Sequence, residues 1–272
     1  MRGGRTLERA AVEAWCSLAG TRADPARIEI LKRGRDGTAV HRLVLPGGAR
    51  SSVIAKRAPE ATAAVERIVY EQLLPGLPVP TLRYFGSVQE AEGGFRWLFL
   101  EDARGGKYRR ERQSHRAAAA RWLGVLHRSL PKVPAVQPLP DRRAPHYRRL
   151  LRSVRDALLL RLAAPALKPE GRAVLEAVLG HCDRLAARWS ELERVCEGIP
   201  DTLVHGDFID NNVHVREEPS GLVFLPFDWE KAGWGVPAED LSSVDGDVYW
   251  VTVRDGPPGL ERTPRRTRPP RS

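Results

Sequence analysis

Apolar side chains recur with two different periods along the first hundred residues. Residues 6–20 carry them at helical spacing and end at Gly20, which predicts a short amphipathic helix. Residues 60–75 return to the same spacing. Residues 26–34, 38–48 and 51–58 contain two or three shorter apolar runs typical of strands, and two further strand candidates lie at residues 81–88 and 95–102. Together these segments predict a small mixed lobe of helices and strands that ends near Asp102.

Longer helical patterns dominate the second part of the chain. Helices are predicted at residues 114–130, 146–163 and 169–197. The first has Ser114 as its candidate N-cap, and a proline-rich connector covers residues 131–145. Two short strands are expected at residues 212–215 and 222–227. Residues 251–272 are rich in proline and arginine without periodicity, so we predict a disordered tail there.

Composition narrows the class of protein. The chain has 272 residues, 42% hydrophobic and 29% charged, a balance typical of a globular protein with one large domain or two small lobes. Its three cysteines lie far apart, which argues against a zinc ribbon or a disulfide framework. There is no apolar run of the roughly 18 residues that a membrane span needs, and the N-terminus does not read as a secretory signal. We therefore expect a soluble, cytoplasmic protein without a membrane partner.

The net charge of +10 is unevenly distributed along the chain. Residues 200–246 hold two basic and ten acidic side chains, a net of −8, against the basic remainder. A basic chain raises the hypothesis of nucleic-acid binding. However, the arginines at 109–110 and 142–155 lack regular aromatic neighbours, so we expect no specific nucleic-acid partner. We therefore expect the catalytic residues to lie in the acidic segment at residues 200–246.

Three polar residues in this acidic segment match the template of a phosphoryl-transfer site. Asp207 follows a short apolar run and the pair His205-Gly206, Asn212 lies five residues later, and Asp228 ends the next apolar run. Kinases place a base Asp and a metal-binding Asn five residues apart in one loop, and a second metal-binding Asp follows. Mg²⁺ prefers the hard oxygen atoms that these side chains supply.

Each of these residues alone also fits a structural role, because Asp and Asn near turns commonly bond the local backbone. All three in this order favour a catalytic site over three independent caps. For His205 we expect a role in bracing the loop rather than in metal binding. For Glu230 we expect an ion-pair role rather than that of a metal ligand.

A phosphate-binding group is expected upstream of the acidic segment. Lys56 ends an apolar strand, the position from which a lysine reaches the α- and β-phosphates in kinases. A lysine at a strand end is also commonly just solvated. Glu66 on the following helix, or else Glu71, is the candidate partner of Lys56. The loop at residues 32–39 contains two glycines and either covers the phosphates or forms a plain hairpin turn.

These motifs resemble the aminoglycoside phosphotransferase/choline kinase-like family. The segments that carry the resemblance are VIAK (53–56), VERIVYEQLLPGLPVP (65–80), WLFLED (97–102), LVHGDFIDNNV (203–213) and FDWEKAGWGVPAEDL (227–241). It covers roughly residues 28–250 and implies an α+β, bilobal protein-kinase-like fold. A small N-terminal antiparallel-sheet lobe with one helix, which binds the nucleotide, would span residues 1–102. A larger, mostly helical lobe with the catalytic and acceptor-binding groups would span residues 103–250.

The resemblance also implies roles for the candidate residues of the second lobe. Asp207 would be the catalytic base, and Asn212 and Asp228 would hold Mg²⁺. Asp240 would brace the catalytic loop rather than take part in the chemistry.

The first lobe would bind ATP, the implied phosphate donor. Lys56 would hold the nucleotide phosphates and Glu66 would align it. Leu100, Glu101 and Asp102 would line the adenine through backbone groups of the hinge between the lobes.

The resemblance predicts a kinase that phosphorylates a hydroxyl of a small molecule, such as an aminoglycoside, an amino alcohol or a sugar-like acceptor. The family usually continues past Asp240 with helices that help to enclose the acceptor, where this chain has its Pro/Arg-rich segment. A catalytically impaired or truncated kinase-like binding protein is therefore the alternative. The oligomeric state is left open by the sequence.

Overall fold

The computed structural model describes residues 6–21, 24–47, 51–91, 93–129, 139–219 and 221–255. Its first part contains a five-stranded sheet in the order β1-β2-β3-β5-β4, with every neighbouring pair antiparallel. The strands are β1 (Arg27–Arg33), β2 (Ala39–Val44), β3 (Ser52–Pro59), β4 (Tyr84–Gln89) and β5 (Phe95–Glu101). All five lie on the apolar runs that predict strands.

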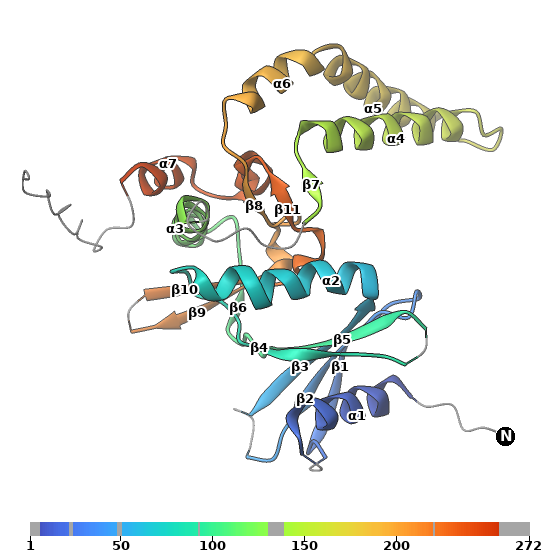
Figure 1. The fold of residues 1–272 in the computed structure, drawn as a ribbon. Helices are drawn as coiled ribbons and strands as arrows, with labels where there is room; N and C mark the ends of the chain where they lie inside the picture. Colours follow the sequence, from blue (N-terminus) through green and yellow to red (C-terminus); the bar gives the residue numbers. More distant parts are fainter. Residues whose placement is uncertain are drawn as a thin grey trace, which may run out of the picture.

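A helix lies on each face of this sheet, α1 (Leu7–Ala19) on one side and α2 (Glu60–Ile68) on the other (Figure 1). Successive side chains of a strand point to opposite faces. Val53 and Ala55 of β3 therefore belong to the apolar cluster under α1, whereas Lys56 reaches the side of α2. The alternation in β3 thus sets which face carries the chemistry.

The predicted helix at 60–75 is regular only as far as Ile68. It continues as a π-turn over Val69–Leu73 and a 3₁₀ turn over Leu74–Gly76. The wider π-turn and the tighter 3₁₀ turn coincide with Pro75, which cannot donate a backbone hydrogen bond.

Helix α3 (Gln113–Ser129) runs through the main apolar core, with ten of its residues buried. It begins one residue before Ser114, which therefore lies inside the first turn and is not the N-cap. Helix α7 (Gly246–Asp255) packs beside α3. Residues 251–255 are thus helical, which corrects the prediction of a disordered tail from residue 251 for those five positions. Residues 256–272 lie outside the described part of the chain.

Two small sheets of short strands support the loops that carry Asp207 and Asp228. One three-stranded sheet has the order β10-β9-β6 and a second has the order β7-β11-β8. Their bounds are β6 (Gly106–Lys107), β7 (Asp141–Arg142), β8 (Thr202–Val204), β9 (Val213–Glu218), β10 (Gly221–Pro226) and β11 (Gly233–Gly235). The predicted proline-rich connector therefore includes a strand, β7.

Helices α4 (Ala144–Leu162), α5 (Pro169–Ala187) and α6 (Trp189–Glu197) extend away from the sheets, with α4 and α5 side by side and the start of α4 next to β7 (Figure 1). The single helix predicted at 169–197 is broken at Arg188, whose backbone leaves the helical region with φ −103° and ψ 13°. Among the described residues, no helix combines the length and the apolar character that a membrane crossing requires.

Candidate active site

The ammonium of Lys56 lies at the centre of three carboxylates. It donates to Glu66 on α2 at 2.7 Å and to Asp228, and it lies 3.4 Å from Glu230. Glu66 is fully buried and Lys56 is largely buried. The pairing with Glu66 selects between the two candidate glutamates, because Glu71 instead pairs with Arg67. The strand-end lysine is therefore part of a buried ion-pair network and is not merely solvated.

Burial and charge act in opposite directions on this network. Burial alone would lower the pKa of Lys56, but the Glu66 and Asp228 carboxylates outweigh it and raise that pKa above its ordinary value. Burial would raise the pKa of Asp228, and the neighbouring ammonium outweighs burial and lowers it. Burial raises the pKa of Glu66, a rise that Lys56 opposes. Lys56 is therefore a fixed cation.

Asp228 takes a backbone conformation that is rare for a residue with a side chain. Its φ of 69° and ψ of 55° lie in the left-handed region, at the point where β10 ends and a 3₁₀ turn over Trp229–Lys231 begins. Among the described residues other than glycine, only Arg104 shares a positive φ. Such a conformation costs about 1–3 kcal/mol and persists where surrounding contacts hold it. Here it accompanies a carboxylate bonded to Lys56.

The loop after β8 carries Asp207 and is cross-linked to the loop of Asp228. The Nδ2 amide of Asn212 donates to the backbone carbonyl of Asp207 at 2.9 Å. The backbone N–H of Phe227 donates to the carbonyl of Asn212 at 2.9 Å. The carboxylate of Asp207 receives a 3.0 Å ion-pair contact from Lys231. These bonds bring the three acidic-segment residues predicted from the sequence into one unit.

Asp240 holds the start of the Asp207 loop through its carboxyl group, as the resemblance implies. Its carboxyl oxygens accept the backbone N–H groups of His205 at 2.6 Å and Gly206 at 3.1 Å. Asp240 is fully buried, and burial raises its pKa to about 7. His205 is also fully buried and faces the carbonyl of Phe227 through Nε2 at 3.0 Å. Burial lowers the pKa of His205 to about 4, so that it is neutral and acts as a structural residue.

Gly206 is required by the close approach of two backbones. It has φ +75°, and a Cβ atom at this position would lie 2.3 Å from the carbonyl oxygen of Lys231. The His-Gly-Asp motif therefore has a packing reason for its glycine.

A cleft of about 700 Å³ opens beside the Lys56 network. That volume is within the range of small-molecule and cofactor sites. The predicted site residues that line it are Lys56, Glu66, Leu100, Glu101, Asp102, Asn212 and Asp228. Parts of the glycine-containing loop line it as well, through Lys32, Asp36, Thr38 and Ala39. Asp207 is not among the lining residues and connects to the cleft through the carbonyl bond to Asn212.

Sequence reasoning missed three polar residues around this site. Lys231 contacts Asp207, Arg42 donates to the Asp102 carboxylate at 2.7 Å, and Ser52 donates to the same carboxylate at 2.7 Å. The Asp102 side chain is thus held within the first lobe. The alternation of apolar and polar residues in β2 marks Arg42 as a polar position of that strand. In the structure Arg42 lies opposite Glu29 across the β1–β2 pair and bonds it at 2.8 Å.

A loop residue to which the sequence assigns no role also has a partner. Asp210 accepts from Arg110 at 2.9 Å, which links the loop of Asp207 to the segment before α3.

Asn212 and Asp228 have the donor chemistry for a magnesium ion. The amide nitrogen of Asn212 is bonded to Asp207, so its Oδ1 atom is not needed for that bond. Both residues line the cleft. Among the described residues there is no cluster of three or more His, Cys, Asp or Glu side chains suited to a metal. Two oxygen ligands fit an ion that keeps several waters and takes its other ligands from substrate phosphates.

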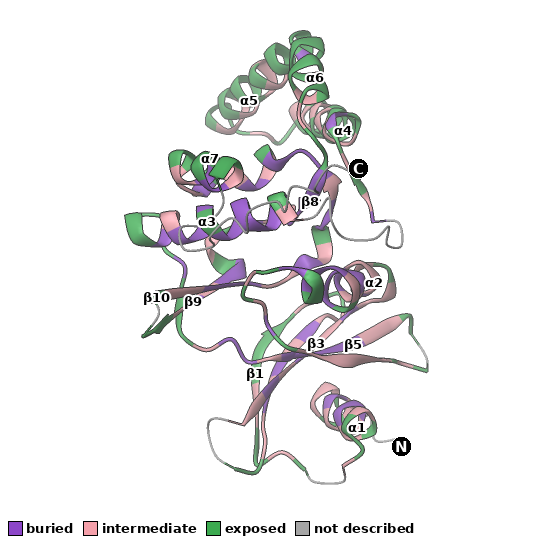
Figure 2. Cartoon of the chain, turned by 60° about the vertical axis from the view of Figure 1, so that its left-hand side comes forward, coloured by how far each residue is buried: buried purple, intermediate pink, exposed green. Residues whose placement is uncertain are grey.

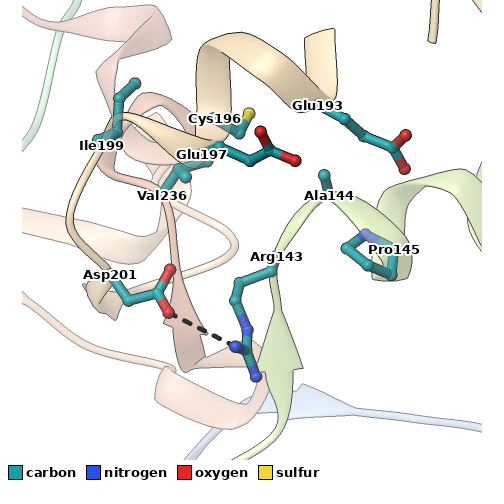
Figure 3. Close-up of a pocket in the computed structure, with 9 residues that line it drawn as sticks. All are labelled: Arg143, Ala144, Pro145, Glu193, Cys196, Glu197, Ile199, Asp201 and Val236. Carbon is teal, nitrogen blue, oxygen red and sulfur yellow. Dashed lines mark ion pairs between the residues drawn. The ribbon is translucent and has the colours of Figure 1, made fainter. Parts of the chain in front are cut away.

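A second cavity, of about 380 Å³, lies where β7 and α4 meet the end of α6 (Figure 3). Its charged lining residues are Glu193, Glu197, Asp201 and Arg143, and Arg143 lies 3.7 Å from Asp201. The two cavities share no lining residue.

The sequence matches the model of the phosphotransferase enzyme family (APH) over residues 27–264. Among curated proteins, none matches this sequence significantly.

Solved phosphotransferases share the fold. Macrolide 2'-phosphotransferase MphH from Brachybacterium faecium matches with a TM-score of 0.58 and 18% identity, over 91% of this chain and 81% of the other. Aminoglycoside phosphotransferase APH(2'')-IIIa, solved with GDP and kanamycin, matches with a TM-score of 0.56 and 13% identity, over 88% and 80%. Spectinomycin phosphotransferase APH(9)-Ia, solved with ADP and spectinomycin, matches with a TM-score of 0.54 and 14% identity, over 81% and 68%. At these identities the likeness establishes the bilobal, kinase-like fold.

Proposed function

The chain belongs to the phosphotransferase enzyme (APH) family and is a small-molecule phosphotransferase, and from this premise we propose that it transfers the γ-phosphate of ATP to a hydroxyl group. The observation that carries the proposal is the single network that joins Lys56 and Glu66 of the first lobe to Asp228 of the second. Phosphoryl transfer depends mainly on positioning and charge stabilisation, and this network supplies both across one cleft.

The first lobe would bind the nucleotide. The ammonium of Lys56, held by Glu66 at 2.7 Å, would bind the α- and β-phosphates. Backbone groups of Leu100, Glu101 and Asp102, which line the cleft, would take the adenine. A nucleotide donor is supported by the relatives that were solved with GDP or ADP.

Asp207 would accept the proton of the acceptor hydroxyl as that oxygen attacks the γ-phosphorus. Its carboxylate is oriented by Lys231, and its backbone carbonyl is fixed by Asn212. Asn212 and Asp228 would hold Mg²⁺, which when bound neutralises charge on the transferred phosphate. We propose an aminoglycoside, an amino alcohol or a sugar-like compound as the acceptor.

ADP release with a panel of hydroxylated acceptors tests this proposal. We expect Mg²⁺-dependent thermal stabilisation by ATP in the native protein, and ADP release above the hydrolysis background with at least one acceptor. Asp228→Ala should lose both. If neither protein is stabilised by ATP with Mg²⁺, the proposed donor is wrong. If ATP binds and no acceptor of these classes is phosphorylated, the proposed acceptor classes are wrong and ATP remains the donor.

A further inference from the structure

The helical hairpin formed by α4 and α5 exposes an apolar face. None of the 19 residues of α5 is buried, and the one buried residue of α4 is Ala144 at its start. Figure 2 shows both helices as mostly exposed or half-buried. Large aliphatic side chains are nevertheless exposed along them. These are Leu150, Val154, Leu159, Leu160, Val174, Val178 and Leu185.

Most of these side chains lie on the same broad face of the hairpin. The positions of α4 that are half-buried at its middle include Leu151 and Arg155, and those of α5 include Leu175 and Leu179. The exposed apolar residues stand one position earlier in both helices, at 150 and 154 and at 174 and 178. In two antiparallel helices, residues one position before the contact line turn to the same side of the pair. Leu185 continues this line on α5.

The size of this face suits a protein interface. A helix of 19 residues is about 28 Å long, and two helices side by side are about 20 Å wide. The resulting area of about 550 Å² is of the same order as the roughly 800 Å² that each partner buries in a standard stable interface. Exposed apolar side chains gathered on one face commonly mark an interaction site.

The charges of the hairpin indicate what covers it. Helix α4 carries five arginines and one aspartate, whereas α5 carries three acidic residues and two arginines. We propose that a second copy of this chain packs on the α4–α5 face through a two-fold axis parallel to the helices. This axis places α4 of one copy over α5 of the other in an antiparallel four-helix arrangement. An axis perpendicular to the helices would instead stack the two arginine-rich α4 helices on each other.

One ion pair between copies follows from this axis. Arg161 lies at the end of α4 and Glu170 at the start of α5, so both lie at the turn of the hairpin. Within the described residues, neither has an ion-pair partner in its own chain. In the proposed pair, Arg161 of one copy is level with Glu170 of the partner subunit. The same contact occurs twice because the interface is two-fold symmetric.

Sedimentation equilibrium of the full chain tests the proposal. We expect the native protein to reach twice the mass of one chain as concentration rises. Val154→Asp and Val178→Asp, at the centre of the face, should remain monomeric. Leu160→Asp is the matched control, because Leu160 is 76% exposed and its helical position turns it away from α5; it should dimerise like the native protein. Circular dichroism melting confirms that each variant is folded.

The charge pair gives a second, independent readout. Arg161→Glu and Glu170→Arg should each weaken the dimer several-fold, and the double variant should regain the native dissociation constant. A native protein that is monomeric at all concentrations overturns the proposal. So does a dimer that Val154→Asp and Val178→Asp leave intact. Dimerisation that appears only after residues 256–272 are deleted would also overturn it, since the chain's own tail would then be the occupant.

Discussion

Lys231 donates a hydrogen bond of 3.0 Å to the carboxylate of Asp207, from a loop 24 positions later in the chain. Lys231 is half-exposed and is not among the residues that line the cleft of about 700 Å³ beside Lys56. Lys231 therefore contacts Asp207, the proposed base, and does not line the cleft in which we propose that ATP binds.

Replacement of Lys231 by methionine should slow turnover without weakening nucleotide binding. Because the ion pair orients the Asp207 carboxylate, we expect kcat to fall by about tenfold, less than the roughly hundredfold that a misplacement of 1 Å can cost. Lys231→Arg should retain most of the activity. Steady-state kinetics and a nucleotide titration measure the two effects separately. An unchanged kcat in Lys231→Met would show that Lys231 does not position Asp207 for turnover.

The buried carboxyl of Asp240 should make stability depend on pH. Its pKa in the folded protein is about 7, above the ordinary value of 3.8. A raised carboxyl pKa means that the folded protein holds this proton longer than the unfolded chain does. The contribution to stability is therefore full below pH 3.8 and is lost as the pH rises through 7.

Asp240→Asn should abolish this pH dependence, because asparagine does not titrate. We expect the native protein's free energy of unfolding, relative to the variant's, to fall by up to about 4 kcal/mol between about pH 4 and pH 8. Urea unfolding of both proteins across this range measures it. A constant difference between the two curves would show that Asp240 stays ionised at every pH tested.

Removal of the Lys56 ammonium should destabilise the fold as well as the nucleotide complex. Lys56→Met leaves the carboxylates of Glu66 and Asp228 without their cation, and breaking a buried ion pair costs about 3–5 kcal/mol. Adding Glu66→Gln removes one of the stranded charges. We therefore expect the double variant to regain part of the stability but none of the affinity for ATP. Denaturant unfolding measures the stability and nucleotide titration measures the affinity for ATP. Equal recovery of stability and affinity in the double variant would contradict the proposed role of Lys56 in binding the phosphates.

Two glycines with positive φ should respond differently to alanine. Gly206→Ala places a Cβ 2.3 Å from the carbonyl of Lys231, whereas Gly20→Ala, at φ +63°, meets nothing within 4 Å. The second change should cost only the left-handed penalty of about 1–2 kcal/mol. The first should cost more and should also lower kcat, because it moves the loop of Asp207. Thermal melts and kinetics check both variants, and equal costs would mean that the loop tolerates the extra carbon.

Local patterns predict most of the fold. The apolar runs of the first lobe, from which four or five strands are expected, form its five strands, because each run is short and bounded by turn residues. The break at Arg188 was not predictable, since neither glycine nor proline interrupts the helical pattern there. Nor were β7 and β11, whose two or three residues form strands only through contacts with distant segments.

The site divides in the same way. Lys56, Glu66 and Asp228 could be found from spacing and from the resemblance, and the structure brings them into contact. The contacts of Lys231 with Asp207 and of Arg42 with Asp102 could not, because they are fixed by the packing of loops and strands rather than by sequence distance. The alternation in β2 marks Arg42 as a polar position but does not identify Asp102 as its partner. The catalytic role of Asp207 and the metal-binding roles of Asn212 and Asp228 stay predictions.

Asp207→Asn tests the central claim most directly, with turnover and nucleotide affinity measured on the same preparation. The substitution keeps the shape of the side chain and removes its ability to accept the hydroxyl proton. We predict that kcat for ADP release falls by about a hundredfold or more, while the dissociation constant for ATP with Mg²⁺ stays close to the native value. A variant that keeps native turnover, or that loses nucleotide affinity in parallel with turnover, would contradict the assignment of Asp207 as the base.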